Sequence, residues 1–134
     1  MEIEEITPTV SCNALARITT PQTLKIEGYI KKKKKVTVLI DSGSTHNFIQ
    51  CTLAKALNCF IYLALEFQVM IANGGTINCS RKFYNINLTM GEYVLNILMI
   101  SIPMGGVDVV LGGQWLKSLG TISFNFQERF LKYF

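Results

Sequence analysis

The stretch that most constrains this chain is Val36–Thr45, where apolar residues lead directly into Asp41, Ser42 and Gly43. The β-branched residues before the acid predict a buried strand. An isolated buried charge costs many kcal/mol unless it is paired or protonated. Because the chain places Asp41 at the end of such a strand, we predict that its carboxylate performs chemistry at the floor of a cleft.

The two residues after Asp41 suit that role. The hydroxyl of Ser42 can hydrogen-bond to neighbouring backbone, while Gly43 permits a turn that a Cβ would forbid and can point its N–H at the carboxylate. A short Asp-Ser-Gly segment is by itself often only a loop. A structural turn acid is therefore the alternative, and the rest of the chain must decide between the two.

The composition predicts one folded domain. The chain has 134 residues, of which 49% are hydrophobic and 16% are charged, as in folded rather than disordered chains. No apolar run reaches the roughly 18 residues that a membrane-spanning helix needs, and the acidic start is not a signal peptide. We expect a tail or linker over residues 1–11, one domain over residues 12–134, a cytoplasmic location and no membrane partner.

The cysteines and the histidine do not predict a metal site. Cys12, Cys51, Cys59 and Cys79 contain no C-x-x-C pair, and His46 is the only histidine, which is too little for a Cys/His zinc site. Without a secretion signal we interpret the cysteines as free thiols, with disulfides as the less favoured alternative. We expect no cofactor.

Alternating apolar and polar residues predict a mostly β chain. A strand over residues 23–30 and another over residues 36–40 form a hairpin whose tip is the run Lys31–Lys35. Asn73-Gly74-Gly75 predicts the tight turn of a second hairpin. The further strands expected are 67–72, 76–80, 83–89, 93–102, 121–126 and 130–134.

Two short helices complete the expected elements. Helical spacing of apolar residues predicts one over residues 47–58, and a second is expected over residues 114–119, ended by Gly120. About eight short strands with two short helices predict an all-β domain that is closed or nearly closed.

The lysine run accounts for the basic character of the chain. Five of the thirteen basic residues are Lys31–Lys35, and the formal net charge is +4. Such a run can bind nucleic acid, but no aromatic residue is interleaved with it. We interpret the run as a solvated hairpin tip, with a nucleic-acid partner as the less favoured alternative.

The order of these segments resembles the retropepsin family, the aspartic proteases of retroviruses and retrotransposons. The resemblance is greatest to the protease of plant Ty3/gypsy-type retrotransposon polyproteins, and it extends over about residues 12–126. The residues that carry it are Thr20–Thr23, Val38–Ile49, Val69–Gly74, Asp108–Gly112 and Gln114–Leu116.

The resemblance implies a retropepsin-like acid protease fold, a closed β-barrel with one or two short helices that acts as a homodimer. It implies that Asp41 is the catalytic aspartate and that Ser42 and Gly43 complete its loop. The residues implied to form the flap over a bound peptide are Ala72, Asn73, Gly74 and Gly75. The residues implied to pack beneath the catalytic loop are Val110, Leu111 and Gly112.

A count of aspartates independently predicts the dimer. Aspartic proteolysis needs two carboxylates that share one proton, because like charges about 3 Å apart cannot both ionise. The chain has two aspartates, Asp41 and Asp108, and Asp108 lacks the hydroxyl and glycine residues that hold Asp41. Two copies of Asp41 must therefore meet across a two-fold axis.

These observations predict an aspartic endopeptidase that uses water and no metal. The expected substrate is the Gag-Pol polyprotein of its own retrotransposon, within virus-like particles if the element is intact. One alternative is a catalytically silent remnant of the same fold that binds peptides or dimerises. A second is a basic protein that associates with nucleic acid through Lys31–Lys35.

Overall fold

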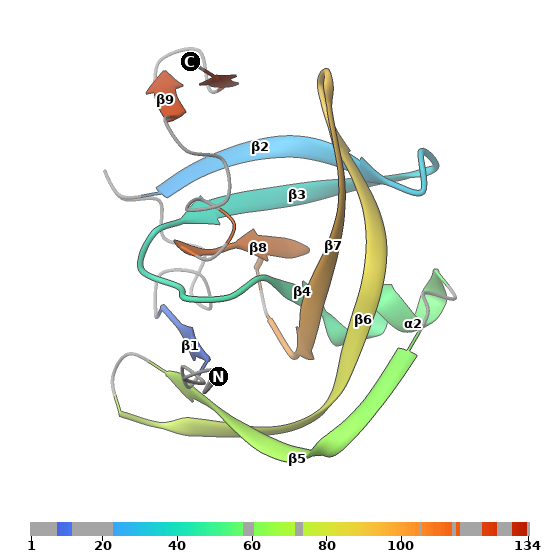
Figure 1. Cartoon of the computed structure of the whole chain (residues 1–134), viewed down its shortest axis with the longest axis vertical. Helices are drawn as coiled ribbons and strands as arrows, with labels where there is room; N and C mark the ends of the chain where they lie inside the picture. The colour runs from blue at the N-terminus through green and yellow to red at the C-terminus, as the bar shows by residue number, and fades with distance from the viewer. Residues whose placement is uncertain are drawn as a thin grey trace, which may run out of the picture.

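The structure, a computed structural model, describes residues 8–11, 23–57, 61–71, 74–104, 106–113, 115, 122–125 and 130–133. Strands dominate these residues, as expected of an all-β chain (Figure 1). The elements are β1 (Thr9–Val10), β2 (Thr23–Ile30), β3 (Lys34–Asp41), β4 (Phe48–Gln50), α2 (Cys51–Ala56), β5 (Ile61–Ile71), β6 (Thr76–Met90), β7 (Tyr93–Ile102), β8 (Val109–Leu111), β9 (Ile122–Asn125) and β10 (Phe130–Tyr133).

One large sheet contains eight of these strands. Its order is β1-β5-β6-β2-β3-β8-β4-β7, and β7 also pairs with β6. Because β7 has both β4 and β6 as neighbours, six strands are linked in a ring, and β5 and β1 extend from β6 (Figure 1). Strands β9 and β10 pair antiparallel as a separate two-stranded sheet.

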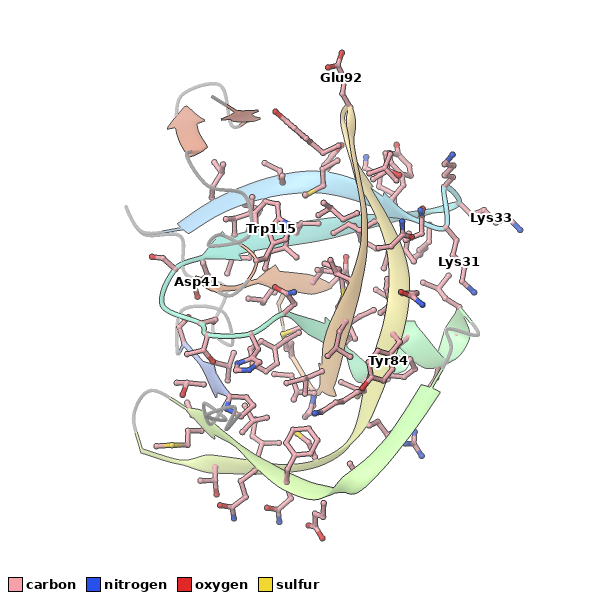
Figure 2. The ribbon with its side chains drawn as sticks, viewed as in Figure 1. Lys31, Lys33, Asp41, Tyr84, Glu92 and Trp115 are labelled. Carbon is pink, nitrogen blue, oxygen red and sulfur yellow. The ribbon has the colours of Figure 1, made fainter. Side chains whose placement is uncertain are left out.

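The predicted hairpin is confirmed, but its turn contains only Lys31–Lys33, because Lys34 and Lys35 belong to β3. Strands β2 and β3 pair antiparallel from Thr23↔Asp41 to Ile30↔Lys34. Lys31 and Lys32 have φ of 54° and 58°, the left-handed values of a type I′ turn. All five lysines are exposed, and Figure 2 shows Lys31 and Lys33 at the opposite end of the molecule from Asp41.

The predicted helix over residues 47–58 is wrong at its start. Residues 48–50 form β4, and α2 begins only at Cys51. Phe48 packs in one hydrophobic core and Ile49 in the other, which a strand achieves because successive side chains point to opposite faces. Pairing of β4 with both β7 and β8 secures this conformation.

The strands predicted over residues 76–80 and 83–89 are one continuous strand, β6. The register with β7 shifts between Phe83 and Ile86, and Asn85 between them has φ of 53°. Asparagine tolerates this left-handed conformation. A bulge therefore bends β6 without interrupting it.

Two hydrophobic cores lie on opposite faces of β3 and β8. Val38 and Ile40 belong to the first core, and Leu39 between them belongs to the second. Val109 and Leu111 likewise belong to the first core, and Val110 to the second. A strand that is buried on both faces must be apolar at every position, so the chain carries continuous apolar runs there.

The remaining sequence predictions have mixed outcomes. The second hairpin is confirmed by the pairing of β5 with β6, although residues 72 and 73 at its tip lie outside the described residues. Most of the helix predicted over residues 114–119 also lies outside them. Cys51 and Cys79 are free thiols, and burial raises the pKa of Cys79 to about 11.

Candidate active site

Asp41 ends β3 with its carboxylate buried, at 1% exposure. Oδ1 accepts a hydrogen bond from the Gly43 N–H at 2.9 Å, and Oδ2 accepts from Ser44 Oγ at 3.2 Å and from Ser11 Oγ. The Ser44 N–H donates to the Asp41 carbonyl at 3.2 Å, which closes the turn. Hydrogen bonds to a carboxylate are strong, so these bonds offset much of the free-energy cost of burying the Asp41 side chain. Ser42, the other predicted loop residue, is exposed.

Ser44 is a site residue that the sequence reasoning missed. Its side chain is 1% exposed, donates to Asp41 Oδ2 and accepts from the Ser11 N–H at 3.1 Å. The available signal was a further hydroxyl residue directly after the Asp-Ser-Gly segment.

The loop that follows Asp41 lies directly on Gly112. A Cβ at position 112 would lie 2.3 Å from the carbonyl oxygen of His46 and 2.6 Å from that of Ser44. The Gly112 N–H donates to Asn47 Oδ1 at 3.1 Å, and the Gly113 N–H donates to the Ser44 carbonyl at 2.7 Å. Only glycine permits this close approach of two backbones.

Strand β8 places this glycine beside the loop of Asp41. It runs parallel to β3, with Leu39 opposite Val110 and Ile40 opposite Leu111. Val110 and Leu111 are fully buried, so the two neighbouring strands end together at Asp41 and Gly112. The structure thus brings the predicted residues 110–112 to the loop of Asp41.

Two of the four residues predicted to form the flap tip are described. Gly74 has φ of 101° and donates its N–H to the Ile71 carbonyl at 2.9 Å, and the Ile71 N–H donates to the Gly75 carbonyl at 2.8 Å. Both glycines are exposed. Ala72 and Asn73 lie outside the described residues. Figure 1 shows the end of β5 and the start of β6 on the same side of the molecule as the loop after β3.

Strand β1 lies between the end of β5 and the loop of Asp41. Thr9 is opposite Met70 in a parallel pairing, and the Met70 N–H donates to the Pro8 carbonyl at 2.8 Å. On the other side, the Thr45 N–H donates to the Thr9 carbonyl at 2.9 Å, and the Thr9 N–H donates to Thr45 Oγ1 at 2.8 Å. Thr9 and Val10 fall within the segment 1–11 for which a tail or linker is predicted, yet as β1 they belong to the large sheet.

His46 lies next to the contact between Thr45 and Thr9. Its Nδ1 lies 2.7 Å from Thr45 Oγ1. Burial, and secondly the positive charge of Lys82, lowers the pKa of His46 from its ordinary value. The imidazole is therefore kept neutral to a lower pH than in an unfolded chain.

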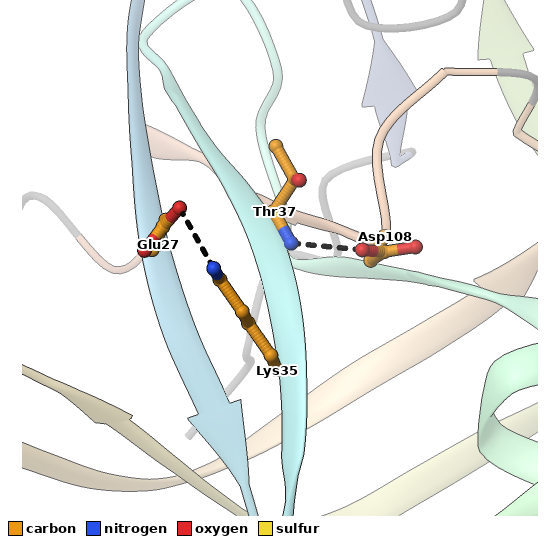
Figure 3. A network of polar contacts seen from close by, with 4 residues as sticks. All are labelled: Glu27, Lys35, Thr37 and Asp108. Atoms are coloured by element: carbon orange, nitrogen blue, oxygen red, sulfur yellow. Dashed lines mark hydrogen bonds and ion pairs between the residues drawn. The ribbon is translucent and has the colours of Figure 1, made fainter.

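Asp108 forms hydrogen bonds with Thr37 of β3 and not with the loop of Asp41. Its Oδ2 accepts from the Thr37 N–H at 2.8 Å, and its own N–H donates to the Thr37 carbonyl at 3.1 Å. Figure 3 shows this contact beside the exposed ion pair of Lys35 with Glu27, at 3.2 Å. Thr37 precedes Asp41 by four residues of β3, which is about 13 Å of strand. Asp108 therefore secures the start of β8 against β3 at a distance from Asp41.

The fold and the buried acid at a strand end define a retropepsin-like domain. The retroviral protease-like domain of Ddi1 from Leishmania major superposes with a TM-score of 0.61 at 11% identity, over 85% of this chain and 90% of that one. A retropepsin-like aspartic protease from Rickettsia conorii superposes with a TM-score of 0.54 at 14% identity, over 81% of this chain and 80% of that one. At these identities the two structures establish the fold alone.

The sequence gives the family. Residues 9–129 match the family described as retroviral aspartyl protease, and the chain belongs to that family. No match to this chain was found among curated protein sequences. In the part of the chain that the structure describes, no helix is long and apolar enough to cross a membrane.

Proposed function

We propose that this chain is an aspartic endopeptidase of the retropepsin type, in which two copies each contribute Asp41. The observation that carries the proposal is the buried carboxylate of Asp41, held by Gly43 and Ser44 at the end of β3. Asp108, the second aspartate of the chain, is bonded to Thr37 about 13 Å of strand away. A dyad thus requires the Asp41 of another copy.

In such a dyad one carboxylate is ionised and the other protonated. The ionised group takes a proton from water as general base, while the protonated group donates a hydrogen bond to the scissile carbonyl. The titration belongs to the pair rather than to either aspartate. The hydrogen bond from the Gly43 N–H would keep each Asp41 carboxylate oriented during the proton transfers.

The proposed substrate is an extended peptide that lies between the β5–β6 hairpin and the loop of Asp41. Such a peptide can add to sheet edges through its main-chain hydrogen bonds. The resemblance to plant Ty3/gypsy-type proteases supports a Gag-Pol polyprotein as the natural substrate, processed in the cytoplasm within virus-like particles. The proposal includes a closed β-barrel protomer, which the double pairing of β7 supports.

The second candidate is a silent module of the same fold that binds peptides or dimerises. The contact of Ser11 Oγ with Asp41 favours it, because this contact helps to bury the carboxylate on which catalysis depends. The two candidates differ in whether peptide bonds are broken.

Asp41→Asn and Asp108→Asn provide a matched pair of variants. Cleavage of an unstructured protein substrate is measured at mildly acidic pH over a series of protein concentrations. We expect Asp41→Asn to lower the rate by about a thousandfold or more. Asp108→Asn should keep most of the activity, because the amide oxygen can still accept from the Thr37 N–H.

Cleavage that persists in Asp41→Asn would refute the aspartic mechanism. Absence of cleavage by the unsubstituted chain, even at concentrations at which it dimerises, would favour the silent module instead. A rate that rises in proportion to the concentration of dimer, rather than of total chain, would support the shared dyad.

A further inference from the structure

Residues 8–11 lie between β5 and the loop of Asp41, which is the place proposed above for the substrate peptide. They lie alongside β5, which leads to the predicted flap, and they contact the loop 41–45 on their other side. We call the surface that they contact, formed by Met70, Thr45, Ser44 and Asp41, the β1 site. Hydrogen bonds join β1 to this surface on both of its edges.

The β1 site binds main chain in the way that sheet edges bind peptide strands. The Met70 N–H donates to the Pro8 carbonyl at 2.8 Å. Thr45 both donates to the carbonyl of Thr9 at 2.9 Å and accepts from its N–H at 2.8 Å. Each of these groups on the β1 site contacts the peptide unit rather than a particular side chain, so another extended segment could use the same groups.

Two side chains of the segment secure it. Val10 is fully buried and packs in the second core, with Val69 and Ile102 among its members. Ser11 is 6% exposed and donates its hydroxyl to Asp41 Oδ2, while its N–H donates to Ser44 Oγ at 3.1 Å. The segment is therefore anchored on one side of β1 and covers the catalytic carboxylate on the other.

The hydrogen bond from Ser11 to Asp41 competes with the dyad. A working Asp41 must share a proton with its partner carboxylate and hydrogen-bond to the attacking water. In the structure, Oδ2 of Asp41 is already occupied by the hydroxyl groups of Ser11 and Ser44, and the residue is 1% exposed. A second carboxylate or a water molecule must therefore compete with Ser11 for Oδ2 of Asp41.

We propose that β1 is an intramolecular cover that occupies the peptide-binding place and inhibits the chain until a second copy or a substrate displaces it. The proposal rests on the proposed function for the identity of Asp41 as the catalytic group. Displacement exchanges the hydrogen bonds of β1 for equivalent bonds to a substrate strand. If the uncovered state is populated at about 1–10%, the apparent affinity for substrate is lowered about 10- to 100-fold.

Val10→Asp tests the cover, with Val94→Asp as its matched control. A charge at position 10 would have to be buried in the second core, so it should expel β1. Val94 is 53% exposed on β7 and receives the same change without burial. Thr9→Pro is a second variant of the cover, which removes the N–H donated to Thr45 Oγ1 and leaves Val10 unchanged.

Three measurements on the full chain separate the outcomes. Hydrogen exchange at the amides of Met70 and Thr45 reports whether β1 has left its site. Sedimentation over a concentration series reports self-association, and hydrolysis of an unstructured protein substrate reports activity. We expect faster exchange at both amides, a dimer dissociation constant lowered about tenfold and a rate raised about tenfold in the cover variants, with the control unchanged.

If the unsubstituted chain cleaves its substrate and the cover variants expose both amides without cleaving faster, β1 is part of the working site and the cover is refuted. If both amides exchange at the wild-type rate in both variants, β1 is not displaceable and the cover is equally refuted. If β1 leaves and the dimer tightens while no variant cleaves, the cover is supported and the proposed protease function fails. The two proposals can therefore fail independently.

Discussion

Replacing Gly112 by alanine should damage the loop of Asp41 more than the same replacement of its neighbour Gly113 would. The new Cβ would lie 2.3 Å and 2.6 Å from the carbonyl oxygens of His46 and Ser44, well under the 3.0 Å that real Cβ atoms keep. Both oxygens belong to the backbone, so the segment around Gly112 must move away from the loop that contains Ser44 and His46. Separation disrupts the hydrogen bonds from Gly112 to Asn47 and from Gly113 to Ser44.

The expected loss of stability follows from those two hydrogen bonds. A buried polar group left without its partner costs about 1–3 kcal/mol, so the loss of both bonds costs about 2–6 kcal/mol. A domain of this kind has a total stability of about 5–15 kcal/mol. We therefore expect Gly112→Ala to remove a large fraction of the stability and to displace Asp41 from its serine and glycine donors.

Gly113→Ala is the matched control in a urea-unfolding experiment. Among the described residues, a Cβ at position 113 meets only the Ser44 carbonyl, at an ordinary 3.6 Å. We expect its free energy of unfolding to stay within about 1 kcal/mol of the unsubstituted chain. Equal stability of the two variants, to within about 1 kcal/mol, would show that the close approach of Gly112 to the loop is wrong.

Two further predictions concern stability. Burial and the charge of Lys82 lower the pKa of His46, so its contribution to stability is present above the pKa of an unfolded histidine and is lost as pH falls through the folded value. Between about pH 7 and pH 5 we expect the unsubstituted chain to lose more stability than His46→Gln, by less than the limit of about 1.4 kcal/mol per pH unit for one proton. If the stability of the unsubstituted chain and that of His46→Gln depended equally on pH, the lowered pKa of His46 would be contradicted. Lys32 has φ of 58°, and Lys32→Gly should raise the free energy of unfolding by about 0.5–1 kcal/mol because glycine adopts this conformation without strain. A lower midpoint in urea would disprove the type I′ turn.

Local patterns were sufficient for much of the fold. The alternation of residues 23–30 and the polar tip after them predicted a hairpin, and the register from Thr23↔Asp41 to Ile30↔Lys34 bears this out. The apolar run into Asp41 predicted an acid at the end of a buried strand, where the structure has it. In both cases the decisive interactions lie within a few residues of one another or along one strand.

Local patterns failed where distant segments decide. Residues 48–50 have apolar spacing that a helix could also use, and only the neighbours β7 and β8 make them a strand. Asn47 shows the same limit, since its amide oxygen accepts from Gly112, 65 residues away. A side chain that bonds to a distant backbone group leaves no periodicity in its own segment.

The sequence by itself determined that one carboxylate is delivered to a strand end and that the chain has only one other aspartate, because composition and alternation are properties of the chain alone. Tertiary structure decided what surrounds that carboxylate. Ser11 reaches Asp41 across 30 residues of chain, and Thr9 meets Thr45 across 36. Such contacts depend on where the intervening strands pair, so only the folded sheet could show that the N-terminal segment covers the group on which the proposed catalysis depends.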